Sequence, residues 1–171
     1  MRSWSMSRRW SAVGLAVATL SAGLVLATAA PASAAALPDG FRSVGYLPSW
    51  SGDVNAIQYD KLSHINYAFA LPNPDGTLQA IEGGDKLSAL VDLGHQNNVK
   101  VSLAIGGWND GNDSAFESLA SSDAGRGTFV DSVMGVIDQY GLDGVDIDWE
   151  YPDPGASGDN FTALLRQLGE A

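Results

Sequence analysis

The sequence predicts an α/β fold, a (β/α)8 TIM barrel of which this chain carries the first four βα units. Short apolar runs alternate with stretches of helical spacing, and this order favours a parallel sheet with right-handed crossovers. Polar or aromatic residues follow the end of each expected strand, which is where the active sites of such barrels lie. The glycine-rich fingerprint of a dinucleotide site, which would favour an open doubly wound sheet, does not follow the first strand.

The first two expected strands are apolar runs that end in turn residues. Residues 43–47 form a short strand that Pro48 and Ser49 end. Residues 62–70 are rich in β-branched and aromatic residues, and residues 72–76 follow with the prolines, asparagine and glycine of a turn. The chain therefore begins with two expected strands, both largely apolar.

A helix and a third strand come next. Apolar spacing predicts a helix over residues 85–96, with Asp85 as its N-cap. Residues 99–105 form another apolar strand, which Gly106 and Gly107 end.

The remaining elements repeat the alternation. Apolar residues at helical spacing predict a helix over residues 125–140, which Gly141 ends. The fourth strand covers residues 145–150. A last helix begins near residue 159 or 160, because an apolar stripe over residues 161–168 follows.

Residues 1–34 have the features of a secretory signal peptide. Three arginines precede an apolar run over residues 12–26, and small residues follow at 32–34. The run is short for a membrane span and has no positive flank after it, so we expect cleavage after Ala34 and a secreted protein with no membrane attachment. The pair Arg8-Arg9 is also compatible with twin-arginine export.

The chain that remains after cleavage, residues 35–171, is strongly acidic. Three of the nine basic residues are removed and all 20 acidic ones stay, which leaves six against 20 and a net charge of −14. Nucleic acid and anionic membranes are therefore poor partners, whereas a neutral carbohydrate meets no such penalty. The sequence has no cysteine, so the hydrophobic core must stabilise the secreted chain without disulfides.

Three carboxylates share one face of the fourth strand. Because side chains alternate along a strand, Asp146, Asp148 and Glu150 point the same way, with neighbours about 6–7 Å apart. A metal site, a solvated sheet edge and acid/base catalysis are the competing interpretations. The pattern of an EF-hand is absent, and parallel strands are usually covered on both faces. Burial would raise the pKa of at least one carboxyl toward that of a general acid, and Glu150, at the exit of the strand, is best placed for that role.

The third strand offers space beside these acids. The same alternation places Ser102, Ala104 and Gly106 on one face, so one face is made of small residues. If the third and fourth strands are neighbours, that face leaves room for hydrogen-bonded carboxylates or a substrate group. Small residues also simply suit a narrow barrel interior.

The fourth strand carries a family signature. Residues 143–150 match, position for position, the DGxDxDWE signature of glycoside hydrolase family 18, the chitinases, and the Tyr-Pro that follows is also typical. Residues 44–50, 64–69 and 104–108 resemble the same family in the same order. Residues 35–171 therefore resemble the N-terminal half of the family's catalytic domain.

The resemblance implies a role for each acid. Glu150 would protonate the leaving glycosidic oxygen, and Asp148 would orient the acetamido group of the substrate. The acetamido carbonyl would attack the anomeric carbon, giving net retention without an enzyme nucleophile. Asp146 would share a proton with Asp148, and Asp143 would be a structural acid. The substrate-binding positions implied in the same way are Tyr46, Phe69, Gly106, Gly107, Trp108, Asn109 and Tyr151.

We accordingly expect a secreted chitinase that hydrolyses β-1,4-linked N-acetylglucosamine polymers, needs no cofactor or metal, and is a monomer when full length. The alternatives are an endo-β-N-acetylglucosaminidase acting on glycoprotein glycans and a chitin-binding lectin, although such lectins usually lack the catalytic glutamate. The family often has serine where Ala104 stands. In the family the second half of the barrel supplies a tyrosine and a tryptophan of the pocket, so we expect this chain to be a fragment with little or no activity alone.

Overall fold

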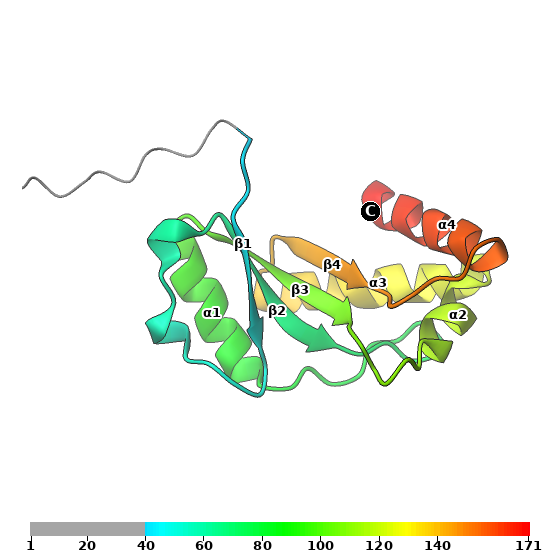
Figure 1. The fold of residues 1–171 in the computed structure, drawn as a ribbon, viewed down its shortest axis with the longest axis horizontal. Coiled ribbons are helices and arrows are strands. Elements are labelled where there is room, and N and C mark those ends of the chain that lie inside the picture. Colours follow the sequence, from blue (N-terminus) through cyan, green and yellow to red (C-terminus); the bar gives the residue numbers. More distant parts are fainter. Residues whose placement is uncertain (1–39) are drawn as a thin grey trace, which may run out of the picture. The chain divides into compact units, whose positions relative to one another are not determined.

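The computed structural model describes residues 40–171 (Figure 1), and the expected signal peptide lies outside the described residues. Four parallel strands form one sheet in chain order: β1 Val44–Pro48, β2 His64–Ala70, β3 Lys100–Gly106 and β4 Gly144–Asp148. The predicted strands are confirmed within two residues at each end. All three neighbouring pairs are parallel, as the alternation of strands and helices predicted.

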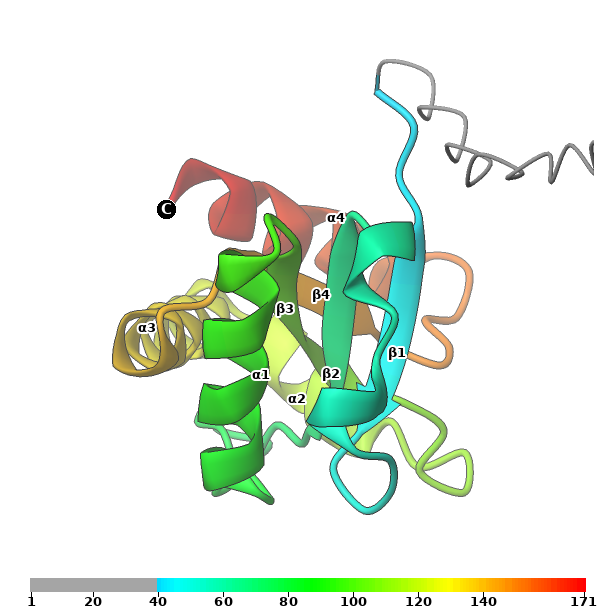
Figure 2. The same ribbon diagram turned by 90° about the vertical axis from the view of Figure 1, so that its left-hand side faces the viewer.

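Helices connect the strands. The helical elements are the 3₁₀ turns Val54–Ala56 and Tyr59–Lys61, α1 Gly84–Gln96, α2 Ser114–Ala120, α3 Asp123–Tyr140 and α4 Ala156–Glu170. Figure 2 shows that α1 and α3 lie on the same side of the sheet. Val145 and Ile147 pack against the core beneath these helices, so Asp146 and Asp148, which alternate with them, lie on the opposite face of the sheet.

The starts of α1 and α4 differ from the prediction. The N-cap of α1 is Gly83, in the left-handed region at φ 66°, and not Asp85, which lies in the first turn where its negative charge suits the helix dipole. Helix α4 begins at Ala156, three residues before the start that was expected, because Gly155 at φ 94° turns the chain into the helix before the apolar stripe appears.

Helix α2 was not predicted. Its seven residues are too few to show a period, yet they bury Phe116 and Leu119 against the core. The start of α3 also comes two residues earlier than expected, since the Ser122 hydroxyl accepts a hydrogen bond from Gly125 N–H at 3.1 Å and caps the helix. The end of α3 at Gly141, with φ 68°, is as predicted.

The core lies between the sheet and the helices. Its largest fully buried side chains come from β2, β3, the helices and the turn before β3: Ile65, Tyr67, Leu87, Leu90, Val99, Val101, Leu103, Ile105, Leu119, Phe129, Val133 and Leu164. Complete burial of such a side chain contributes about 1.5–3 kcal/mol relative to exposure. Within residues 40–171, no helix is both long and apolar enough to cross a membrane.

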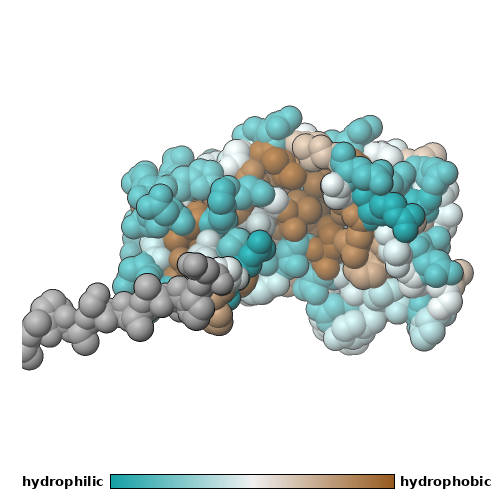
Figure 3. Space-filling model, turned by 90° about the horizontal axis from the view of Figure 1, so that it is seen from above, coloured by the Kyte–Doolittle hydropathy of each residue, from teal (hydrophilic) through white to brown (hydrophobic). Residues whose placement is uncertain are grey.

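One edge of the described sheet borders an exposed apolar surface. Side chains of β4, α3 and α4 line a groove of about 940 Å³ along the outer edge of β4: Val133, Met134, Ile137, Val145, Ile147, Phe161, Leu165 and Leu168. Figure 3 shows a continuous hydrophobic area on the face that carries this edge. Asp146 also lines this groove, whereas Asp148 and Glu150 do not.

Candidate active site

The register of β3 and β4 places the small residues beside the acids. Ala104 pairs with Asp146 and Gly106 pairs with Asp148, so the juxtaposition expected from the sequence is confirmed. Strand β4 ends at Asp148, two residues earlier than predicted, so Glu150 lies in the loop that leaves the strand. The acid that was expected to act as proton donor therefore stands at the carboxyl end of the sheet.

Asp146 is anchored to two other strands. Its Oδ2 atom accepts a hydrogen bond from the Tyr46 hydroxyl of β1 and one of 2.9 Å from the Asn66 side-chain amide of β2. Tyr46 and Asn66 are paired in the register of β1 and β2, and Asn66 is only 8 % exposed. Because the sheet curves, side chains from β1, β2 and β4 meet over the small residues of β3.

Asp146, Asp148 and Glu150 form an acidic row, and Asp148 lies between the other two charges. Burial raises the pKa of its carboxyl, and repulsion from the charges of Glu150 and Asp146 raises it further. The Tyr46 phenol also has a raised pKa, first because of its hydrogen bond to Asp146. A group beside Asp148 that carries positive charge or donates a hydrogen bond would therefore be favoured.

A pocket opens directly on the two acids nearest the end of the strand. Its empty volume is about 380 Å³, and Asp148 and Glu150 line it together with Gly106, Gly107 and Asn109. Loop residues after β2 and residues at the start of α2 complete its wall. Two carboxyl groups, those of Asp148 and Glu150, thus face the same solvent-accessible space.

A second, aromatic pocket adjoins the first. It has an empty volume of about 550 Å³ and shares Gly106, Gly107 and Asn109 with the pocket that holds the acids. The exposed side chain of Trp108 and the ring of Phe69 line it. Rings of this kind present flat apolar faces, which suit the apolar faces of sugar rings.

The glycine pair at the end of β3 allows the backbone to approach β4 closely. Gly107 N–H donates a hydrogen bond of 2.8 Å to the carbonyl oxygen of Asp148. At Gly106, where φ is 114°, a Cβ atom would lie 2.2 Å from that same oxygen. No side chain fits at Gly106 without displacing the backbone of Asp148.

Trp149 holds the segment between the two acids from the other face. Its indole N–H donates to Asp113 Oδ2 at 3.1 Å. The ring stacks on Phe116, with centroids 5.2 Å apart, and meets Phe161 edge to face at 5.6 Å. Asp148 and Glu150 are therefore separated by a residue that is fixed between α2 and α4.

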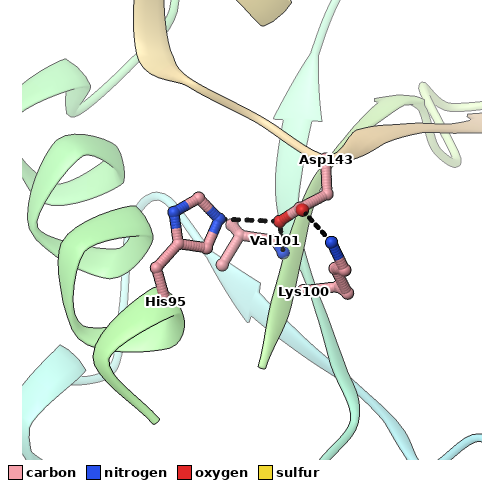
Figure 4. Close-up of polar contacts among 4 residues, drawn as sticks. All are labelled: His95, Lys100, Val101 and Asp143. Atoms are coloured by element: carbon pink, nitrogen blue, oxygen red, sulfur yellow. Dashed lines mark hydrogen bonds and ion pairs between the residues drawn. The ribbon is translucent and has the colours of Figure 1, made fainter. Parts of the chain in front are cut away.

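Asp143 lies at the opposite end of β4, away from both pockets. Figure 4 shows its carboxylate between His95, Lys100 and the backbone of β3. The contacts are 2.7 Å to His95 Nε2, 2.6 Å to Lys100 Nζ and 2.8 Å to Val101 N. Burial acts to raise the pKa of Asp143, but hydrogen bonds from Lys100, Val101 and His95 outweigh it and lower the pKa to about 2.

Of the predicted substrate-binding residues, five line the pockets: Phe69, Gly106, Gly107, Trp108 and Asn109. Tyr46 contacts Asp146 instead, and Tyr151 lines neither pocket and is 68 % exposed. A hydrogen bond with Glu150, together with repulsion from its charge, raises the pKa of the Tyr151 phenol. Among residues 40–171 there is no group of three or more acidic or histidine side chains placed to hold a metal ion.

The sequence motifs and this arrangement agree with a family comparison. The family model for glycosyl hydrolases family 18 matches residues 42–171. The chain belongs to this family.

Two relatives illustrate the similarity within family 18. Chitinase 1 of Aphanocladium album is 32% identical over 183 residues, covering 89% of this chain and 42% of the relative. A probable endochitinase of Caenorhabditis elegans is 34% identical over 119 residues, covering 64% of this chain and 19% of the relative. The chain thus spans less than half the length of each of these relatives.

Two solved structures show the same fold. A mutant class V chitinase from Nicotiana tobaccum in complex with NAG4 has a TM-score of 0.67 and 29% identity, covering 74% of this chain and 38% of that chain. A chitinase-like agglutinin from Robinia pseudoacacia has a TM-score of 0.67 and 29% identity, covering 73% and 39%. The predicted fold class, with four βα units of a (β/α)8 barrel, is confirmed.

Three residues that matter to this family 18 site were missed in the sequence. Asn66 could have been found from the period of two, since it shares its face of β2 with Ala68 and lies in register with Tyr46. Asp113 gave no signal, because it precedes a helix that was not recognised. Trp50 lies in the stretch 44–50 that resembles the family but was not named as a substrate-binding residue, yet it lines the aromatic pocket and stacks on Phe69, with ring centroids 6.3 Å apart.

Replacing Asp143 by asparagine should lower the free energy of unfolding by about 1–2 kcal/mol near pH 7. The folded-state pKa of about 2 lies below the ordinary 3.8, so the stabilisation is present above about pH 4 and is lost as the pH falls toward 2. Denaturant unfolding at pH values between about 7 and 3 measures this, with Asp138→Asn on the exposed side of α3 as the control. A difference that stays constant with pH would contradict the expectation.

Proposed function

We propose that this protein is a secreted chitinase that hydrolyses β-1,4 links between N-acetylglucosamine units, with Glu150 as the proton donor. The proposal rests on one observation: Glu150 and Asp148 line the same pocket, which lies at the carboxyl end of a parallel sheet. Active sites of (β/α)8 enzymes lie at this end of the sheet. Family membership and the chitinase names of many relatives support the same activity.

In the proposed reaction, Glu150 gives its proton to the glycosidic oxygen of the scissile bond. The carbonyl oxygen of the substrate's own acetamido group attacks the anomeric carbon, the glycosidic bond breaks, and a cyclic oxazolinium ion forms. Glu150, now ionised, takes a proton from a water molecule that attacks the same carbon. Two inversions at that carbon give a product with retained configuration.

Asp148 would stabilise this intermediate. Its carboxylate can accept the acetamido N–H and so orient the carbonyl toward the anomeric carbon, while its negative charge offsets the positive charge of the oxazolinium ion. The raised pKa of Asp148 supports the role, because a carboxyl that is crowded by Glu150 and Asp146 gains most from a nearby positive charge. Asp146, held by Tyr46 and Asn66, would share a proton with Asp148.

The two adjoining pockets suit a chain of neutral sugars. One sugar ring would lie at the acids, and further rings would extend along the surface lined by Phe69 and Trp108. The net charge of residues 35–171 favours such a ligand over a polyanion. We assign Tyr151, next to Glu150 and 68 % exposed, to the same ligand.

The remaining parts of the proposal concern the rest of the chain. Residues 1–34 would direct secretion, Asp143 would act as a structural acid, and the complete protein would be a monomer. Residues 40–171 by themselves would hydrolyse little or no substrate, since Asp146, Asp148 and Glu150 all remain partly exposed to water.

A chitin-binding lectin is the second candidate. The similarity to the chitinase-like agglutinin of Robinia pseudoacacia, whose TM-score equals that of the tobacco chitinase, supports it. A lectin would bind oligosaccharides without cleaving them. The presence of Glu150 beside Asp148 in one pocket favours the enzyme.

The proposal is tested by comparing two oligomers with the protein expressed from its complete coding sequence. A hexamer of N-acetylglucosamine should be hydrolysed, and a hexamer of glucosamine should react at least about 10²-fold more slowly, because it lacks the attacking carbonyl. Chromatography of the products gives both rates. Rapid hydrolysis of the glucosamine hexamer would argue for Asp148 as a direct nucleophile, and binding without cleavage would favour the lectin.

A further inference from the structure

The first turn of α1 contains a lysine in an unfavourable position. Lys86 is the third residue of the helix, where the positive end of the helix dipole disfavours a cation. It forms no salt bridge within residues 40–171. Its ammonium instead donates to three backbone carbonyl oxygens: Pro48 at 2.7 Å, Ser49 at 3.2 Å and Ser51 at 2.5 Å. All three N–H donors of the ammonium group are thereby used.

These three carbonyls surround one residue of the loop after β1. Trp50 lies between Ser49 and Ser51, and both of these neighbours are bound by Lys86. The Trp50 side chain is 66 % exposed, and its ring stacks on Phe69. Ser49 is also held by its N–H, which donates to the Ala68 carbonyl at 2.7 Å, and by its hydroxyl, which donates to Glu82 Oε2 at 3.1 Å. Hydrogen bonds from a charged donor are about twice as strong as neutral ones, so Lys86 adds the strongest donor of the loop and the one that reaches the Ser51 carbonyl.

The position of Trp50 indicates which part of a ligand it meets. Trp50 lines the aromatic pocket but not the pocket that contains Asp148 and Glu150. The two pockets meet at Gly106 and Gly107. A sugar stacked on Trp50 is therefore removed from the scissile bond, and only an oligosaccharide long enough to span both pockets reaches it.

We propose that Lys86 is a positioning residue that fixes Trp50 for a distal sugar unit and so sets the preference of the site for long over short oligosaccharides. This inference rests on the proposed function. Without the ammonium group the three carbonyls turn to water, and the Ser51 side of the loop must be ordered again each time a long ligand binds. The loop before α1 does not depend on Lys86 in the same way, because the Tyr67 hydroxyl donates a hydrogen bond of 2.9 Å to the Glu82 carbonyl.

The test uses Lys86→Met in the protein expressed from its complete coding sequence. Methionine keeps the length and apolar stem of lysine and removes the donors. We expect KM for the N-acetylglucosamine hexamer to rise about 3- to 10-fold with kcat within about twofold, and the kinetics of a chromogenic disaccharide substrate to stay unchanged. Lys86→Arg, which retains donors, should restore most of the hexamer affinity. Lys61→Met, which removes an exposed lysine of the second 3₁₀ turn, is the charge control and should behave as wild type.

A double variant separates positioning from general loosening of the fold. In a Trp50→Ala background, Lys86→Met should cause no further change in KM for the hexamer, because the indole that it positions is gone. Equal losses on the hexamer and the disaccharide, or additive losses in the double variant, would overturn the inference. If Lys86→Met does not fold, Lys86→Gln replaces the charged donor by a shorter, neutral one, and a smaller rise of KM for the hexamer with an unchanged disaccharide is expected.

The inference and the proposed function fail in different ways. If wild-type protein cleaves the hexamer but Lys86→Met has the same KM, the positioning role is wrong and the hydrolase stands. If wild type cleaves neither substrate, the hydrolase fails, and calorimetric affinities for the hexamer and for a disaccharide replace KM in the same comparison. Absence of any binding by the wild type would overturn both.

Discussion

Replacing Glu150 by glutamine should lower kcat for hydrolysis of the N-acetylglucosamine hexamer by about 10²- to 10⁴-fold, the usual contribution of a positioned general acid. Glutamine has nearly the same shape, but its amide cannot give a proton to the leaving oxygen. KM should change by no more than a few-fold, because the walls of the pocket around Glu150 are left in place. Steady-state kinetics of the protein expressed from its complete coding sequence measure both parameters.

The matched control for this variant is Glu170→Gln, at the exposed end of α4. It removes the same charge far along the chain from the acidic row and should leave kcat unchanged. If Glu150→Gln retains more than about a tenth of the wild-type kcat, the assignment of the proton donor is wrong. A second carboxylate, with Asp148 as the first candidate, would then have to supply the proton.

Replacing Gly106 by alanine should destabilise the protein by about 2–4 kcal/mol and reduce hydrolysis together with stability. The new Cβ would lie 2.2 Å from the carbonyl oxygen of Asp148 and 2.9 Å from a ring carbon of Phe116. The φ angle of 114° is also one that alanine rarely adopts. The strand end that carries Asp148 must therefore move, which disturbs its position relative to Glu150 even in molecules that stay folded.

Gly127→Ala is the control for this substitution. Gly127 lies within α3 with open space around its Cα, so alanine there should stabilise the protein by about 0.5–1 kcal/mol. Denaturant unfolding compares the two variants, and hydrolysis of the hexamer gives their activity. A Gly106→Ala protein as stable and active as wild type would show that the close approach of β3 to β4 is not needed.

The sequence predicted the sheet well because its strands follow simple periodicity. Alternation placed Asp146 and Asp148 on one face of the fourth strand and Ala104 and Gly106 on one face of the third. The register shows that the two strands are neighbours and that these residues are paired. The left-handed glycine at the end of α3 was equally clear, since Gly141 follows a long run of helical spacing. Local patterns of this kind depend on neighbours along the chain, which a single sequence displays.

Contacts between distant segments were beyond such patterns. Asn66 lies 80 residues from the Asp146 carboxylate that it contacts, and only the curvature of the sheet brings them together. Asp143 was assigned a structural role, but nothing in its surroundings along the chain pointed to His95 and Lys100 as its partners. The catalytic roles of the acids remain predictions, which the Glu150 and glucosamine experiments address.

The loops were predicted least well. Helix α2 is too short for its period to be recognised. The hydrogen bond from the Trp149 indole to Asp113, which precedes this helix, was therefore missed. The contact of Lys86 with the carbonyls around Trp50 joins a helix to a loop more than 30 residues earlier, and lysine carries no sequence signal for such a role. These contacts, which shape the surroundings of the two pockets, could be found only in the structure.

The most direct test of substrate-assisted hydrolysis at this acidic row is the anomeric configuration of the first product. Proton NMR during cleavage of the N-acetylglucosamine hexamer, by protein expressed from its complete coding sequence, resolves the α- and β-anomers before they equilibrate. We predict that the β-anomer forms first, because attack by the acetamido carbonyl followed by water inverts the anomeric carbon twice. Initial formation of the α-anomer would contradict the mechanism, and absence of cleavage would contradict the hydrolase.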